Sequence, residues 1–284
     1  RMKLEQQMYE IPGIGKEKIY TIGNLENLSA TALYYGEGGG SSGFGGGFSG
    51  GGFGGIGKKE CDKYGIVKIG RQTWMSENLR TTTYNNGTEI PEVSEQSVWL
   101  RLGNDAFCRY NNDKNYADTF GLLYNWYAVR TGSLCPVGWR VPTDEEWKYL
   151  EGSVDSRYGI GDPHWDRSGL RGEDVGLKLK NHTGWRRGIN GTNNYGFSAL
   201  PGGERLSRFY AGGSSGFWWS SSEASESSAW YRSLIYSYEY VARDTHPKRM
   251  GFSVRCITDI IRTPQSSTLS CSFFEGIYWL LYCL

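Results

Sequence analysis

The sequence predicts an α+β domain between residues 58 and 259, built from twisted antiparallel strands, one or two short helices and long ordered loops. Three observations predict it. A short apolar run, Ile66 to Ile69, has the length and composition of a strand. A capped amphipathic segment after Pro142 is typical of a helix. From Phe197 onward, short apolar runs alternate with turns rich in Gly and Ser.

The predicted helix carries the clearest local signals. Thr143 is a good N-cap, and Glu146 three residues later completes the pattern of a capping box. Trp147, Leu150 and Val154 then recur at helical spacing, which predicts one buried stripe. The helix therefore begins after Thr143 and packs against the core through its aromatic and aliphatic side.

Shorter signals predict the remaining elements. Gln72 to Leu79 is expected to continue as strand and turn, and Asn85-Asn86-Gly87 is a tight-turn signal. Phe120 to Val129 fits either a buried strand or a short helix, because so short an apolar run has no deciding period. Val175 to Lys180 is equally ambiguous.

The end of the predicted domain reads as a half-buried strand. Phe252, Val254 and Cys256 alternate with Ser253, Arg255 and Ile257, so Cys256 is expected to face inward. Upstream, a second alternation predicts one shared face for a set of larger side chains: Trp230, Arg232, Leu234, Tyr236, Tyr238 and Tyr240.

Three flanking segments differ from the predicted domain. Residues 1–37 are weakly patterned, and residues 1–20 contain no apolar signal-peptide run. Residues 38–57 are nearly all Gly with Ser and Phe, a composition that predicts a flexible linker. Residues 260–284 form a tail whose apolar run is far shorter than the ~20 residues of a membrane helix.

Composition limits the partners. The net charge is +1 and charged residues make up 21% of the chain, so bulk electrostatics favours neither nucleic acid nor a membrane surface. We therefore expect no nucleic-acid partner, and membrane contact only through an unseen anchor. Eleven Trp and twenty Tyr can supply a core, because each ring buries a large area.

The motifs of common active sites are weak. None of the three histidines, His164, His182 and His246, has a partner at metal-ligand spacing, and the six cysteines include no CxxC pair. A GxSxG match at Gly212–Gly216 lies in a Gly/Ser turn, where chance explains it. We therefore expect no catalytic residue, no metal and no cofactor.

Three questions stay open from the residues alone. Acidic loops at 111–113 and 173–174 have oxygen donors suited to calcium, although such loops more often cap turns. Cysteines in the predicted domain fit either structural disulfides or free buried thiols. The segment from Trp218 to Gly251 is rich in Ser and Tyr, as adaptable contact surfaces are, but an ordinary solvated region with packed Tyr fits as well.

Six runs of residues resemble the Fibrobacter succinogenes major paralogous domain, from about Tyr64 to Ile257. They are QTWMSENLRTTTYNNGTEIP, YNNDKNYADTFGLLYNWYAV, LCPVGWRVPTDEEWKYL, GFSALPGGER, GFWWSSSE and MGFSVRC. That family is similar to the C-type-lectin-like group, which includes formylglycine-generating enzymes. The resemblance implies paired N- and C-terminal strands, a ligand face built from long loops, and a disulfide between Cys135 and Cys256.

The chain also departs from those relatives. Formylglycine-generating enzymes use a copper-binding cysteine pair shortly before the closing strand, and no cysteine lies between Trp219 and Gly251. The calcium motifs of animal C-type lectins are absent as well.

Residues 218–256 resemble the variable region of proteins diversified by retroelements. That resemblance implies a fixed scaffold of Trp218, Trp219, Phe252 and Val254 around exposed contact positions. The candidate ligand-binding residues are Glu223, Tyr231, Ser233, Tyr236, Tyr238, Tyr240, Arg243, Asp244 and His246.

These observations favour a non-enzymatic surface or secreted module that binds a protein or glycan ligand at a cell surface. The expected location is extracellular or at the cell surface. Two alternatives stay open: an oxidase related to formylglycine-generating enzymes, and a purely structural surface paralogue.

Overall fold

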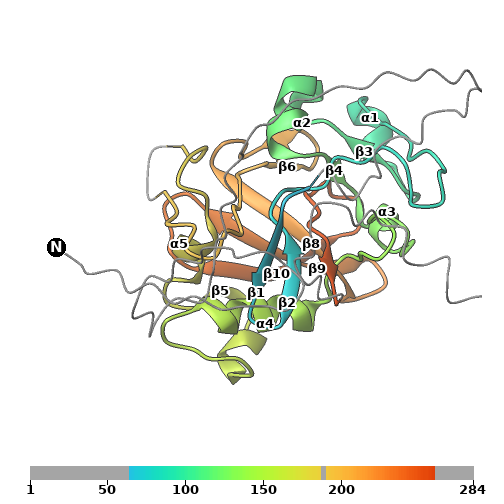
Figure 1. The fold of residues 1–284 in the computed structure, drawn as a ribbon. Coiled ribbons are helices and arrows are strands. Elements are labelled where there is room, and N and C mark those ends of the chain that lie inside the picture. Colours follow the sequence, from blue (N-terminus) through green and yellow to red (C-terminus); the bar gives the residue numbers. More distant parts are fainter. Residues whose placement is uncertain (1–63, 187–189, 260–284) are drawn as a thin grey trace, which may run out of the picture. The chain divides into compact units, whose positions relative to one another are not determined.

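The computed structural model describes residues 64–186 and 190–259, whose elements are drawn in Figure 1. The described helices are α1 (Gln96–Trp99), α2 (Lys114–Phe120), α3 (Trp126–Val129), α4 (Asp144–Val154) and α5 (Val175–Leu179), with 3-10 helices η2 (Tyr110–Asn112) and η3 (Pro163–Asp166). The described strands are β1 (Ile66–Ile69), β2 (Gln72–Met75), β3 (Phe107–Cys108), β4 (Leu123–Tyr124), β5 (Gly169–Arg171), β6 (Glu204–Arg205), β7 (Phe209–Tyr210), β8 (Ser215–Glu223), β9 (Ser228–Ile235), β10 (Val241–Pro247) and β11 (Ile257–Thr258). Residues 1–37, the predicted linker at 38–57 and the tail at 260–284 lie outside the described residues.

The two ends of the described chain pair in one sheet. β1 and β2 form an antiparallel hairpin, and β11 adds to the other side of β2, with Ile257 opposite Trp74. The tight turn between β1 and β2 contains Gly70 at φ +58, a conformation that glycine adopts without strain. This pairing agrees with the expectation that the N- and C-terminal strands of the domain meet.

Helix α4 confirms the prediction from the capping box. The Thr143 hydroxyl accepts a hydrogen bond from the Glu146 N–H, and the Glu146 carboxylate accepts one from the Thr143 N–H. Trp147, Leu150 and Val154 are all buried, as their spacing predicts. The helix packs them into a core cluster that also contains Trp74, so it fixes the first sheet against the rest of the domain.

The four-stranded antiparallel sheet, in the order β5-β10-β9-β8, separates two core clusters. Trp218 and Leu234 point to the side of α4 and α5, whereas Trp219 and Ala229 point to the opposite side. Successive residues of a strand face opposite sides, so these strands bury both of their faces over much of their length. Figure 1 shows β8, β9 and β10 crossing the middle of the described domain.

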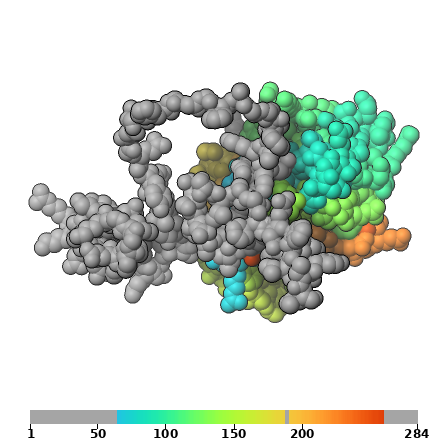
Figure 2. All heavy atoms as spheres, turned by 45° about the vertical axis from the view of Figure 1, so that its right-hand side comes forward, coloured from blue at the N-terminus to red at the C-terminus, as the bar shows by residue number. Residues whose placement is uncertain are grey.

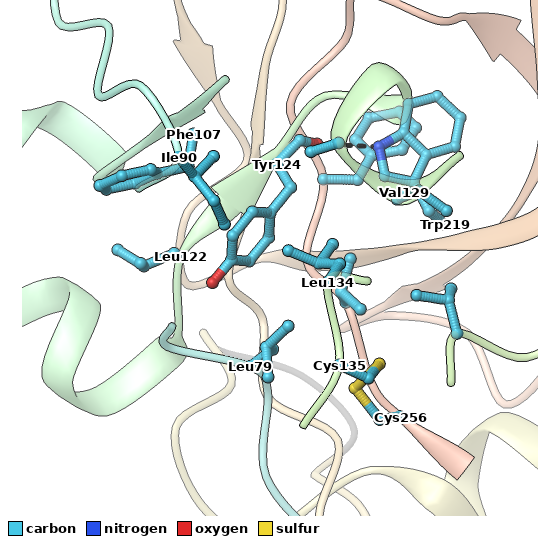
Figure 3. Packing of buried hydrophobic residues seen from close by; sticks show 14 of the residues in the cluster. Leu79, Ile90, Phe107, Leu122, Tyr124, Val129, Leu134, Cys135, Trp219 and Cys256 are labelled. Carbon is cyan, nitrogen blue, oxygen red and sulfur yellow. Dashed lines mark hydrogen bonds between the residues drawn. A yellow bond between two sulfur atoms is a disulfide. The ribbon is translucent and has the colours of Figure 1, made fainter. Parts of the chain in front are cut away.

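The second cluster gathers around Tyr124 (Figure 3). The Trp219 indole N–H donates to the Tyr124 carbonyl at 2.9 Å, and the Tyr124 hydroxyl donates to the Thr81 carbonyl at 2.6 Å. At the edge of the cluster, Cys135 and Cys256 form the disulfide that the family resemblance implies. The bond joins segments 121 residues apart in the sequence.

One expectation about secondary structure needs correction, and one run that the sequence left open is resolved. Residues 252–256 are not a half-buried strand, because the alternate residues Ser253 and Arg255 are as fully buried as Phe252. The segment forms β-bridges to both Tyr124 and Trp218. Other parts of the chain therefore cover both of its sides, which explains the burial. The ambiguous run at 120–129 contains both predicted structures, β4 and then α3.

Segments far apart in the sequence form a common surface in the described domain, as the cyan-green and orange atoms of Figure 2 show. Distant segments also meet beneath the surface, where the ammonium group of the buried Lys248 lies 4.8 Å from the ring centroid of the buried Trp126. Within the described residues, no helix has the length and apolar character needed to cross a membrane.

Candidate ligand-binding face on the four-stranded sheet

The structure divides the candidate residues between the two ends of the sheet. Glu223 and His246 lie toward the end where β8 turns into β9, whereas Tyr236, Tyr238 and Tyr240 lie in the turn between β9 and β10. Eight residues of β9 separate these ends, a distance of roughly 26 Å at 3.3 Å per residue. The nine residues therefore do not form the single contact surface that the sequence suggested.

Two of the candidates are buried, so their assignment as contact residues was wrong. Ser233 is only 5% exposed and lies between Phe217 on β8 and Ala242 on β10. Arg243 is only 6% exposed, and its guanidinium donates to both carboxylate oxygens of Asp144. Neither side chain can reach an external ligand in this fold.

Arg243 belongs to a buried charged cluster of Asp144, Glu151, Arg171, Arg232 and Arg243 between α4 and the sheet. Arg232 bridges the two acids, with N–O distances of 2.7 Å to Asp144 and 2.5 Å to Glu151. Burial alone would raise the pKa of Asp144, but hydrogen bonds and charge from Arg243 and Arg232 outweigh it and lower this pKa to about 2. The cluster fixes the sheet to α4 and makes the scaffold rigid.

The open part of the sheet carries Tyr231, Asp244 and His246 on the side away from α4. Asp244 lies directly opposite Tyr231 in the β9–β10 register, so both side chains point to the same face. The His246 ring centroid is 5.7 Å from that of Tyr231, and both rings pack against Phe252. The sheet and the core below hold these groups in place.

Several polar atoms of this face lack a protein partner. Within the described residues, the Tyr231 hydroxyl and the Asp244 carboxylate have no side-chain partner; Asp244 accepts only from the Thr245 N–H. The His246 Nδ1 atom is buried and has no hydrogen-bond partner there. Polar groups that a rigid fold leaves without partners are available to a ligand.

Glu204 on β6 belongs to the same region, and sequence reasoning missed it. Burial raises the pKa of Glu204 to about 7. Burial raises the pKa of Tyr231 to about 12, and the charges of Asp244 and Glu204 add to this effect. Burial lowers the pKa of His246, which favours its neutral imidazole. No local motif marks Glu204, because its burial arises only when β6 packs beside the sheet.

We expect the stability of the protein to fall as the pH rises from about 4.5 to about 7 through the titration of Glu204. The pKa of Glu204 is raised from 4.5 in the unfolded chain to about 7, so the folded state binds the extra proton in this window. Glu204→Gln should remove this dependence of the unfolding free energy on pH. It should also raise the free energy of unfolding at pH 8 by roughly 1–2 kcal/mol.

Urea unfolding at pH 5 and pH 8 measures the effect. Glu226→Gln is the matched control, since it removes one carboxylate from an exposed loop. If the unfolding free energy of Glu204→Gln changes between pH 5 and pH 8 as much as that of the wild type, the burial of this carboxylate has no energetic consequence.

The turn at the other end of the sheet is held by Lys180. Its ammonium group donates to the carbonyl oxygens of Ile235, Tyr236 and Tyr238, at 2.7 Å for the last. Tyr238 and Tyr240 are each 42% exposed. This end therefore presents two ordered tyrosines, separate from the Tyr231 face.

Glu223 has a structural partner of its own. Its carboxylate forms an ion pair with the buried Lys248, whose ammonium group also donates to the Glu226 carbonyl at 2.6 Å. These contacts close the loop between β8 and β9. Glu223 is exposed, so it stays a candidate contact, but one already engaged by the protein.

The acidic loops considered for calcium make hydrogen bonds within the protein. Asp113 caps α2 by accepting from the Asn115 N–H, and Asp174 accepts from the Ser156 hydroxyl and N–H. Within the described residues, no group of three or more His, Cys, Asp or Glu side chains is arranged to hold a metal ion.

The fold and site together define an α+β domain with short helices, several antiparallel sheets and a candidate binding face on the four-stranded sheet. The family model described as Fibrobacter succinogenes major domain matches residues 67–258, more than half of the chain. The chain therefore belongs to the Fibrobacter succinogenes major domain family. Comparisons with curated proteins and with solved structures found no match.

Proposed function

We propose that the chain is a non-enzymatic surface or secreted module that binds a protein or glycan ligand through the face around Tyr231. The observation that supports this most directly is the set of partnerless polar groups on a rigid sheet. Tyr231 and His246 pack against Phe252, so their rings would lose little conformational freedom on binding, and Asp244 is placed beside Tyr231 by the β9–β10 register. A tyrosine with polar neighbours is also typical of contact surfaces.

The proposal includes a C-type-lectin-like fold and an extracellular or cell-surface location. The pairing of β11 with β2 and the disulfide between Cys135 and Cys256 support the fold. The disulfide also supports the location, because such bonds persist in oxidising compartments.

The cysteines weaken the oxidase alternative. In the described residues, Cys135 and Cys256 are bonded to each other, and Cys108 is free and buried. Burial raises the pKa of the Cys108 thiol to about 12, so it is not a reactive thiolate at neutral pH. The described domain thus has no thiolate pair of the kind that binds Cu(I).

A screen of glycans and peptides with matched variants tests the proposed function. Tyr231→Phe removes one hydroxyl and keeps the packing, and Asp244→Asn removes one exposed charge. We expect the double variant, which combines the two substitutions, to bind the ligand about tenfold or more weakly. Tyr238→Ala and Tyr240→Ala at the far turn serve as the control and should leave binding unchanged.

Binding that survives the face variants but is lost with the Tyr238 and Tyr240 variants would move the site to the far turn. A protein that binds nothing in the screen, yet self-associates, would favour the structural paralogue instead.

A further inference from the structure

A hollow of about 220 Å³ lies at the surface between α1 and the segments around β6 and β10. It is lined by Trp99, Leu100, Leu206, Ser207, Arg249 and Met250. The lining includes no aspartate or glutamate. Burial and the nearby charge of Arg249 both act to lower the pKa of His246, so the hollow that Arg249 lines adjoins the proposed binding face.

Two arginines give this hollow a positive charge. Arg249 is exposed on its rim and forms no ion pair with a described residue. Arg205 is only 1% exposed, and its guanidinium carbon lies 4.5 Å from the ring centroid of Trp99. Its nitrogens donate to the carbonyl oxygens of Val93 and Ser94, each at 2.7 Å, and no described carboxylate pairs with it.

Glu204 precedes Arg205 on β6, but it does not neutralise that charge directly. Successive residues of a strand point to opposite sides, and Glu204 forms no ion pair with a described residue. A buried cation that lacks a carboxylate partner attracts an anion more strongly than an exposed one, because the surrounding dielectric is low. The positive field at the hollow is therefore built into the fold.

The other lining groups suit the body of a small ligand. Ser207 offers a hydroxyl, and Leu100, Leu206 and Met250 give apolar walls. The Trp99 indole N–H is buried and has no acceptor within the described residues. Apolar walls with a few polar groups are the usual composition of a small-molecule site.

We infer that this hollow binds the carboxylate of a small acidic group, with Arg249 as its principal partner. Arginine suits this role because its planar fork matches the two oxygens of a carboxylate. The carboxylate belongs either to an acidic sugar or to an acidic amino-acid side chain. The inference rests on the proposed function, since it names the chemistry of a ligand that the adjoining Tyr231 face would share.

Calorimetric titration of the full chain with D-glucuronate and with N-acetylglutamate methylamide tests the inference. D-glucose and N-acetylglutamine methylamide are the neutral probes. We expect at least one acid to bind about tenfold more tightly than its neutral counterpart, and the preference to weaken in high salt. The acid that binds more tightly identifies the source of the carboxylate.

Arg249→Gln should remove about tenfold of this affinity. Arg208→Gln is the matched control, since Arg208 is exposed one residue after Ser207 but does not line the hollow. Equal binding of acids and neutral probes, no binding of either acid, or equal effects of the two variants would overturn the inference. A ligand that depends on Tyr231 but shows no preference for acids would leave the proposed function intact and remove this inference alone.

Discussion

We expect Asp144→Asn to lower the free energy of unfolding by about 3 kcal/mol or more. Asp144 is the shared partner of two buried arginines, Arg232 and Arg243. The asparagine keeps the shape of the side chain but leaves both cations without this counter-charge. Breaking a buried ion pair from one side is costly because the remaining charge stays out of water.

Chemical denaturation at pH 7 measures this loss. Asp166→Asn is the matched control, since Asp166 is exposed and its only ion-pair partner among the described residues is Lys148. We expect the control to cost no more than about 0.5–1 kcal/mol. Similar losses in the two variants would show that the buried cluster contributes no more than a surface pair.

The same carboxylate predicts part of the acid sensitivity. The pKa of Asp144 is lowered from 3.8 to about 2, so its contribution is complete above about pH 4. It should be lost as the pH falls from about 4 toward 2, because only then does the folded state take up the proton. Asp144→Asn should lack this part of the acid transition.

The second large effect concerns the disulfide. We expect the double variant Cys135→Ala, Cys256→Ala to lose roughly 3–5 kcal/mol of unfolding free energy. The bond closes a loop of 121 residues, so its removal gives the unfolded chain much more conformational freedom. Both cysteines are buried, and their loss also removes contacts beside Trp139 and Val254 in the same core cluster.

Cys108→Ala is the control for the loss of a buried sulfur atom without a bond. Cys108 is buried and free, so its replacement should cost about 1 kcal/mol. The thermal midpoints of the wild type with and without reductant give an independent measure. A double variant as stable as the control would show that the disulfide does not stabilise this fold.

Local signals allowed the main helix and the strand character of the first apolar run, Ile66 to Ile69, to be predicted. The cap at Thr143 and the stripe from Trp147 to Val154 act within the eleven-residue helix and the one residue before it, and tertiary packing only completes them. The disulfide was different in kind. The residues alone did not decide whether the cysteines of the domain are bonded or free. Only the resemblance to the family implied a bond between Cys135 and Cys256.

The charged residues of the sheet show where sequence reasoning stopped. Arg243 was expected among the contact residues, and Arg232 was expected only to share one strand face with Trp230 and Leu234. Arg232 pairs with Glu151, 81 residues away, and Arg243 pairs with Asp144, 99 residues away. No short-range spacing in the sequence therefore predicts these ion pairs. Glu204 was missed for the same reason, since its burial depends on distant segments.

Because β8, β9 and β10 are buried on both faces over much of their length, only some positions of this region can differ freely among related copies of the gene. Between residues 218 and 256 the exposed positions are Glu223–Ser227, Ser237, Tyr238, Tyr240, Asp244 and Arg249. Substitutions there would leave the core untouched, except at Glu223, whose carboxylate pairs with the buried Lys248; changes at the buried positions of the segment would disturb packing or buried charge. A family of paralogues could therefore alter its recognition properties in two separate blocks, one at each end of the sheet, while the fold between them stays constant.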